Sequence, residues 1–214
     1  MLRYLKILIA LLCLGTGSIH AQLKFKTQFY TGFDLYCWYK NPRSSARECE
    51  AGLSSGSALS SVPIGTRLLV GKDNFSISAE AGADLQFFAL DVNHFKGLGA
   101  VAFPLLLKMN FGAVSGFSKT KLVGWSLGGG IQYQKTELFY LTEDYKDLER
   151  KIFPTYIGEI AIGGGVRGFQ TSYFVRVGFG KLQATSVNTG FYFFLDLSGP
   201  KNQKQATIIE PRSI

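Results

Sequence analysis

Beyond residue 23 the chain repeatedly alternates between apolar and polar residues. The first such stretch spans residues 24–35. Its odd positions are mostly apolar, and its even positions are Lys24, Lys26, Gln28, Tyr30, Gly32 and Asp34. Because successive side chains of a β-strand point to opposite faces, this period of two predicts a strand with one apolar and one polar face.

The same alternation recurs along the rest of the chain. Seven further stretches lie at residues 63–71, 75–88, 98–113, 122–135, 153–168, 170–181 and 187–197. Most are long enough to cross a bilayer, since a tilted membrane strand needs about 9–11 residues. The pattern therefore predicts an all-β protein: a single closed, antiparallel, up-and-down transmembrane β-barrel of about eight strands.

The connections between these stretches differ in length. The longest are residues 38–62, 89–97 and 136–151, whereas residues 72–74 form a tight turn. Outer-membrane barrels have short periplasmic turns and longer external loops. We therefore expect the three long connections outside the cell and both termini on the periplasmic side.

Residues 1–21 have the pattern of a secretory signal peptide. Arg3 and Lys6 precede an apolar core at residues 7–14 that is too short to span a bilayer, and small and polar residues lead to cleavage after Ala21. We expect export to the Gram-negative outer membrane, a barrel domain at residues 22–198 and a flexible periplasmic tail at residues 199–214.

The polar faces carry charges of both signs. Candidates for an internal charge network are Asp34, Arg67, Glu80, Asp84, Lys108, Glu159 and Arg176, with Arg167 and Asp196 as further candidates. Burying an unpaired charge costs several kcal/mol, and an eight-stranded barrel is just wide enough to be filled by its own side chains. We expect salt bridges to fill the lumen, with inward glycines such as Gly82 and Gly128 making room. A proton or ion path, or a hidden active site, is the alternative.

Composition supports a membrane barrel more than it supports helices. The chain has 25 Gly and 18 Phe residues, which suits tightly packed strands with aromatic belts at the membrane interfaces. Aromatic residues near strand ends are candidates for these belts: Tyr30, Tyr36, Trp38, Tyr39, Trp125, Tyr133, Tyr156, Tyr173 and Tyr192. The formal net charge is +8, but the basic residues form no stripe, so nucleic acid is not an expected partner.

Two cysteines follow the signal segment, Cys37 and Cys49. An exported protein meets an oxidising compartment, so the pair predicts a disulfide that closes the connection after the first strand. Two unpaired thiols are the alternative. A metal site is not expected, because His94 is the one histidine beyond the signal segment.

The last strand carries a recognisable motif. Residues 188–195 read Asn-Thr-Gly-Phe-Tyr-Phe-Phe-Leu and look like the assembly signal of small outer-membrane barrels. With the Ala21-Gln22 cleavage site and the strand count, residues 22–198 resemble the small outer-membrane β-barrel domain family common in Bacteroidota. Members usually end at this signal, whereas this chain continues to Ile214. The resemblance implies an architecture and no particular activity.

No residue pattern points to catalysis or a cofactor. A lipid-modifying barrel would pair a strand histidine with a serine two residues away, but His94 is followed by Lys96 and lies in a predicted loop. The leading hypothesis is a structural, adhesion or partner-binding barrel. It contacts outer-membrane lipid and lipopolysaccharide, and its loops are available to another envelope protein. The alternatives are a lipid-modifying enzyme or small transporter, and a secreted lipocalin-like barrel whose apolar faces point inward.

Overall fold

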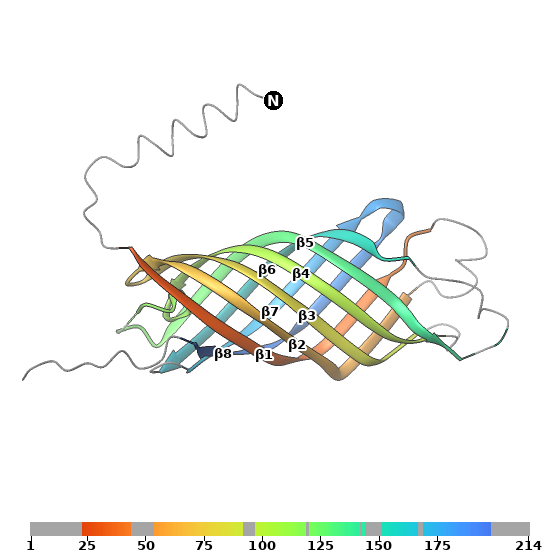
Figure 1. Cartoon of the computed structure of the whole chain (residues 1–214), viewed down its shortest axis with the longest axis horizontal. Coiled ribbons are helices and arrows are strands. Elements are labelled where there is room, and N and C mark those ends of the chain that lie inside the picture. Colours follow the sequence, from red (N-terminus) through yellow and green to blue (C-terminus); the bar gives the residue numbers. More distant parts are fainter. Residues whose placement is uncertain are drawn as a thin grey trace, which may run out of the picture.

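The structure is a computed structural model that describes residues 23–43, 54–91, 97–118, 120–141, 143, 151–166 and 169–197. Within these residues, eight antiparallel strands close into a barrel in which β8 pairs with β1 (Figure 1). The strands are β1 (Lys24–Lys40), β2 (Ser54–Lys72), β3 (Phe75–Asp91), β4 (Gly97–Gly112), β5 (Val123–Tyr140), β6 (Phe153–Val166), β7 (Phe169–Gly180) and β8 (Thr185–Asp196). The predicted fold class and strand number are confirmed.

Several strands extend further than the alternation predicts. β1 continues to Lys40, β2 already begins at Ser54, β3 runs on to Asp91 and β5 to Tyr140. Parts of the predicted loops 38–62, 89–97 and 136–151 are therefore strand, and this boundary prediction was wrong. The added segments lack a clear apolar face, yet ladder hydrogen bonds to the neighbouring strands still hold them in the sheet.

Bulges in several strands lie towards the same end of the barrel. The register shifts between Asp34 and Tyr36 in β1 and between Gly56 and Ser61 in β2. An extra residue changes which side chains face inward. After the β1 bulge it is Cys37 and Tyr39 that point into the lumen, both fully buried.

The connections fall into two groups at opposite ends of the barrel. At one end, Asp73 and Asn74 join β2 to β3, residues 167–168 join β6 to β7, and residues 113–122 join β4 to β5. The last connection contains the 3₁₀ helix η1 (Ala113–Ser115). At the other end lie the strand ends that residues 41–53, 92–96 and 141–152 connect, together with the turn at residues 181–184, which contains the 3₁₀ helix η3 (Lys181–Gln183). No helix among the described residues is long and apolar enough to cross a membrane.

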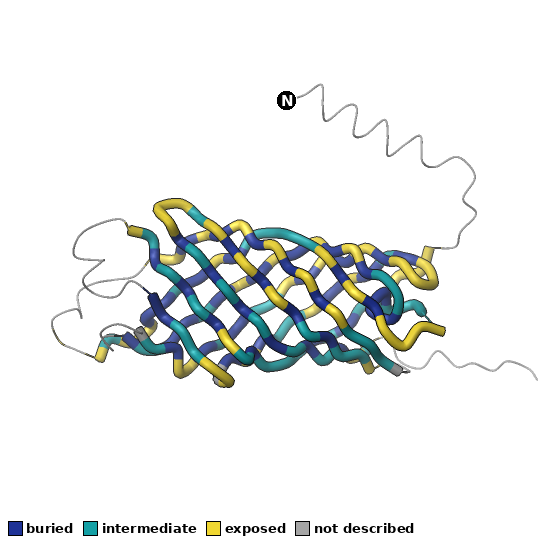
Figure 2. The backbone as a smooth tube through the Cα atoms, turned by 180° about the vertical axis from the view of Figure 1, so that it is seen from behind, coloured by how far each residue is buried: buried dark blue, intermediate teal, exposed yellow. Residues whose placement is uncertain are grey.

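Apolar side chains cover the outside of the barrel, and polar side chains fill the inside. Along each strand, exposed and buried residues alternate (Figure 2). Phe25 is 79% and Leu107 64% exposed, whereas Asp34 is 1% and Arg176 0% exposed. A lipocalin-like barrel requires the opposite arrangement, so this orientation excludes that alternative.

Candidate functional site

The lumen is organised around Arg176, which is completely buried. Its Nε donates to Glu159 Oε2 at 2.9 Å, and its Nη1 donates to Asp84 Oδ2 at 2.8 Å and to Gln132 Oε1 at 3.1 Å. Its Nη2 donates to the hydroxyl of Tyr192. A guanidinium carries five N–H donors in a planar fork, so one side chain ties together partners from β3, β5, β6 and β8.

A second cation, Lys108, links this group to the next. Its ammonium group lies 2.6 Å from Glu80 Oε2 and also contacts Glu159. Glu80 in turn lies 4.0 Å from Arg67 Nη1. The buried charges form one chain of alternating sign that crosses the lumen in the order Arg67, Glu80, Lys108, Glu159, Arg176 and Asp84. Because positive and negative charges follow one another, each charge offsets part of the desolvation cost of its neighbours.

Arg67 also organises the end of the lumen where the short turns lie. Its Nε donates to Gln28 Oε1 and its Nη2 to Gln170 Oε1, both at 2.6 Å. Gln28 Nε2 donates to Asp196 Oδ1 at 2.5 Å, and Asp196 forms an ion pair with Lys26 at 2.8 Å. Asp196 therefore points inward, as the alternation suggested.

The 3₁₀ helix η1 folds across this end of the lumen. Ala113, Val114 and Ser115 are all buried. Gln170 Nε2 donates to the carbonyl oxygen of Ala113 at 2.5 Å, and Lys26 Nζ donates to that of Gly116 at 2.7 Å. The connection between β4 and β5 is thus pinned over the barrel mouth by side chains from inside.

Asp34 lies towards the opposite end and is held by hydrogen bonding. Its Oδ2 accepts from Asn188 Nδ2 at 3.2 Å. Asn188 also donates to the hydroxyl of Tyr39 at 2.7 Å, and the same hydroxyl accepts from Gln86. All seven proposed network residues are buried, and every one except Asp34 takes part in an ion pair among the described residues.

The predicted disulfide between Cys37 and Cys49 stays a prediction, because the structure does not describe Cys49. Cys37 is a free, buried thiol whose Sγ donates to Gln86 Oε1 at 3.2 Å. The β1 bulge turns Cys37 into the lumen. Cys49 lies outside the described residues, as do Arg167 and His94.

Three tyrosines predicted for the aromatic belts lie inside the barrel instead. Tyr30, Tyr39 and Tyr192 are all buried. The rings of Tyr30 and Tyr192 meet edge to face with centroids 5.1 Å apart, and Phe174 stacks on Tyr192 at 4.1 Å. Tyr30 and Tyr192 occupy the same parity as the buried charges, so the alternation alone could have placed them inside.

Gly82 makes room for this aromatic group. A Cβ added there would lie 2.1 Å from the hydroxyl oxygen of Tyr30 and 2.7 Å from the carbonyl oxygen of Ile64. Gly65 also faces Tyr30, at 2.5 Å. These inward glycines therefore leave room for the large side chain of Tyr30, as the sequence predicted for Gly82.

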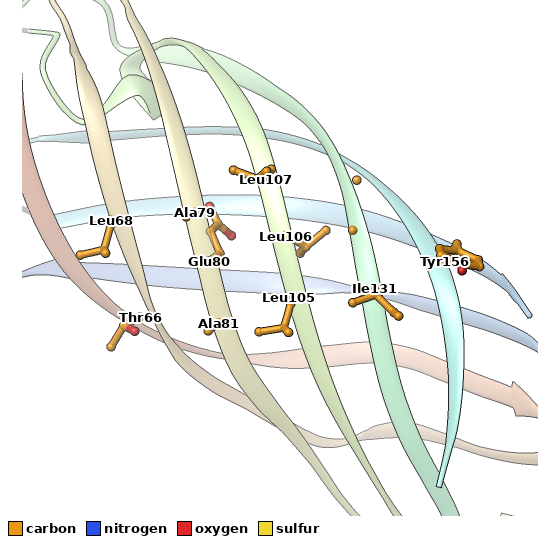
Figure 3. Close-up of a pocket in the computed structure, with 12 residues that line it drawn as sticks. Thr66, Leu68, Ala79, Glu80, Ala81, Leu105, Leu106, Leu107, Ile131 and Tyr156 are labelled. Carbon is orange, nitrogen blue, oxygen red and sulfur yellow. The ribbon is translucent and has the colours of Figure 1, made fainter. Parts of the chain in front are cut away.

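A shallow groove of about 620 Å³ crosses the outer wall over β2 to β6 (Figure 3). Small residues, Ala79, Ala81, Gly129 and Gly130, form part of its lining, and larger apolar side chains such as Leu107 and Ile131 stand beside them. The groove opens towards the membrane and brings together no group of acids, bases or nucleophiles. No set of three or more His, Cys, Asp or Glu side chains in the described ranges could hold a metal ion.

No protein family and no curated protein matches the chain by sequence. Several solved structures are similar to it at low identity, among them the following three. Neisserial surface protein A has a TM-score of 0.46 and 7% identity, with 81% of this chain and 97% of that chain covered. The N-terminal β-barrel domain of Pseudomonas aeruginosa OprF has 0.44 and 10%, covering 79% and 98%. The outer membrane protein OprG from Pseudomonas aeruginosa has 0.39 and 11%, covering 81% and 92%.

The wall and the lumen by themselves define the class of protein. In lipid every backbone polar group must be paired internally, and a closed barrel achieves this with strands. An apolar outer face around a polar interior is the arrangement of transmembrane barrels, in contrast to soluble ones. The chain is an outer-membrane β-barrel protein.

Proposed function

We propose that this barrel has a structural, adhesion or partner-binding role and that its lumen is not an open pore. The observation that carries the proposal is the continuous chain of ion pairs that runs from Arg67 to Asp84 through the buried interior of the barrel. Helix η1 over one mouth supports the same conclusion. A solute would have to break several buried ion pairs to pass, and each broken pair leaves an unpaired charge in a low-dielectric interior.

In this role the external loops make the contacts with partners, and the wall makes the contacts with lipid, including lipopolysaccharide. The role requires no enzymatic activity and no cofactor. The motif at residues 188–195 supports placing the chain with the small barrels of Bacteroidota type. A partner would be sought by co-purification in mild detergent, comparing the full chain with variants shortened in the loop at residues 44–53 or 144–150. Loss of the same protein from the shortened variants would support external recognition.

The closed lumen is tested by conductance in planar lipid bilayers. The wild-type protein should carry no steady ionic current. Glu159 and Arg176 are register partners on β6 and β7, and they lie in the middle of the ion-pair chain. Replacing both with Ala interrupts the chain and should produce measurable conductance. The matched control replaces Ile160 and Val175, the next pair along the same strands, whose side chains face lipid.

The control variant should stay silent. A wild-type barrel that conducts steadily would overturn the closed lumen. Circular dichroism and heat-modifiable migration on gels would establish that both variants are folded, so that silence of the Glu159 and Arg176 variant counts against the proposal.

A further inference from the structure

Three cationic side chains gather at the end of the barrel that carries the longer connections. Lys40 ends β1, Arg43 follows it, and Lys181 begins the turn between β7 and β8. Arg43 and Lys181 are exposed, and Lys40 is half-buried. We call these three residues the basic ridge.

Barrel closure brings the ridge together. Lys40 pairs with Thr185 at the start of β8, and the backbone N–H of Arg43 donates to the carbonyl oxygen of Leu182 at 3.1 Å. Paired strands lie about 5 Å apart, so the three side chains start from neighbouring backbone positions. The described residues around them, 36–43, 151–156 and 178–188, contain no Asp or Glu. The positive charge of the ridge is therefore not neutralised from its own strands.

An aromatic belt lies next to the ridge on the outer wall, on the side towards the middle of the barrel. Tyr156 and Phe179 form a cross-strand pair and are 73% and 65% exposed. Tyr36 is also exposed, and Trp38 stands two residues before Lys40. Aromatic rings on membrane proteins collect at the level of the lipid headgroups. Two residues along a strand span about 7 Å, which places the ridge at or just beyond the depth of the phosphates.

We propose that the basic ridge binds the phosphate groups of a phosphorylated glycolipid of the outer leaflet, of the lipid A type. Arg offers a planar fork that matches phosphate oxygens, and Lys adds compact positive charge. The inference rests on the proposed function, because it requires that this end of the barrel is external. The aromatic belt below the ridge would contact the sugar and the upper part of the acyl chains.

The test uses the full chain in nanodiscs of zwitterionic lipid. Bisphosphorylated lipid A and chemically dephosphorylated lipid A are added separately, and binding is measured by native mass spectrometry. The ridge variant is Lys40→Gln with Arg43→Gln and Lys181→Gln. The matched control is Lys24→Gln with Lys72→Gln and Lys121→Gln, three exposed lysines at the opposite end.

Because each cation near a membrane surface contributes a modest attraction, loss of all three should weaken binding of bisphosphorylated lipid A about tenfold or more. The control variant should bind like the wild type, and dephosphorylated lipid A should bind weakly to every form. The inference would be overturned if the ridge variant bound bisphosphorylated lipid A as well as the wild type does. It would also be overturned if the control variant lost as much binding as the ridge variant, or if the wild type bound both forms of lipid A equally.

Failure here and failure of the proposed function are distinguishable. A barrel that inserts and stays electrically silent but shows no preference for phosphorylated lipid A contradicts the ridge alone. A barrel that conducts ions yet binds phosphorylated lipid A through the ridge contradicts the closed lumen alone.

Discussion

At the scale of single residues, the interior depends on where large and small side chains meet. Tyr30 extends from β1 over Gly65 of β2, and its hydroxyl lies where a side chain at Gly82 of β3 would begin. Small barrels have no spare volume, so a large polar group on one strand requires a small residue opposite. Glycine is needed at position 82 because its missing side chain leaves room for Tyr30, and not because of its backbone flexibility.

This pairing predicts a difference between two glycine substitutions. Gly82→Ala should destabilise the barrel by about 1–3 kcal/mol, because the new methyl group overlaps Tyr30 and the backbone of Ile64. Gly158→Ala is the control: it faces outward, and an added Cβ would meet no atom within 4 Å. Its effect should stay within about 0.5 kcal/mol. The free energy of unfolding in urea from lipid vesicles measures both, and equal effects would contradict the packing account.

At the scale of elements, the tight turn between β2 and β3 sets the register of that hairpin. Lys72 pairs with Phe75, which leaves only Asp73 and Asn74 in the turn. Asp73 adopts a φ of 50°, in the left-handed region. Asp tolerates this region better than most residues, whereas a β-branched side chain does not.

The turn therefore predicts an order of stability among variants at one position. Asp73→Val should cost about 1–2 kcal/mol through backbone strain, and Asp73→Gly should be neutral or slightly stabilising. Lys72→Val is the control, because Lys72 lies in β2, where valine is well accepted. Urea titration of the folded protein in vesicles would rank the three. A valine at position 73 that is as stable as glycine would argue against the left-handed turn.

Strand β1 shows which part of a strand could be predicted from the alternation and which part could not. Its alternation was visible from Lys24 to Leu35, and those residues lie in a strand with the expected faces. Beyond Asp34 the bulge adds a residue, and the polar and apolar parities exchange. Tyr39 was misassigned to an aromatic belt for this reason. A pattern with a period of two cannot reveal an inserted residue whose register depends on two neighbouring strands.

At the scale of the whole molecule, the apolar wall specifies where the barrel resides. On β4 the outward side chains run from Val101 to Phe111, and Leu107 stands midway between Phe103 and Phe111. Phe25 lies at the edge of the wall, next to the start of β1. The cost of a charge on a lipid-facing position depends on its depth in the bilayer.

Depth gives a prediction for the same substitution at two places. Leu107→Arg should destabilise the inserted barrel by about 2–4 kcal/mol, whereas Phe25→Arg should cost about 0–1 kcal/mol because its side chain reaches the interface. Both positions are highly exposed, so loss of internal packing is small in each case. Urea unfolding from vesicles provides the comparison. Similar costs at the two sites would mean that Leu107 does not lie near the middle of the bilayer.

The sequence by itself determined the strands, their number and the division of each strand into an apolar and a polar face. These follow from a local rule, because successive side chains of a strand point to opposite sides. The structure decided that the apolar faces point outward. Tertiary structure decided which charges meet: Arg176 reaches Asp84 and Glu159, while Asp34 is left to Asn188. It also decided that Lys40 and Lys181 become neighbours, since only closure of β8 on β1 joins those segments. Register, bulges and closure depend on contacts between distant strands, and a pattern read along one strand carries no information about them.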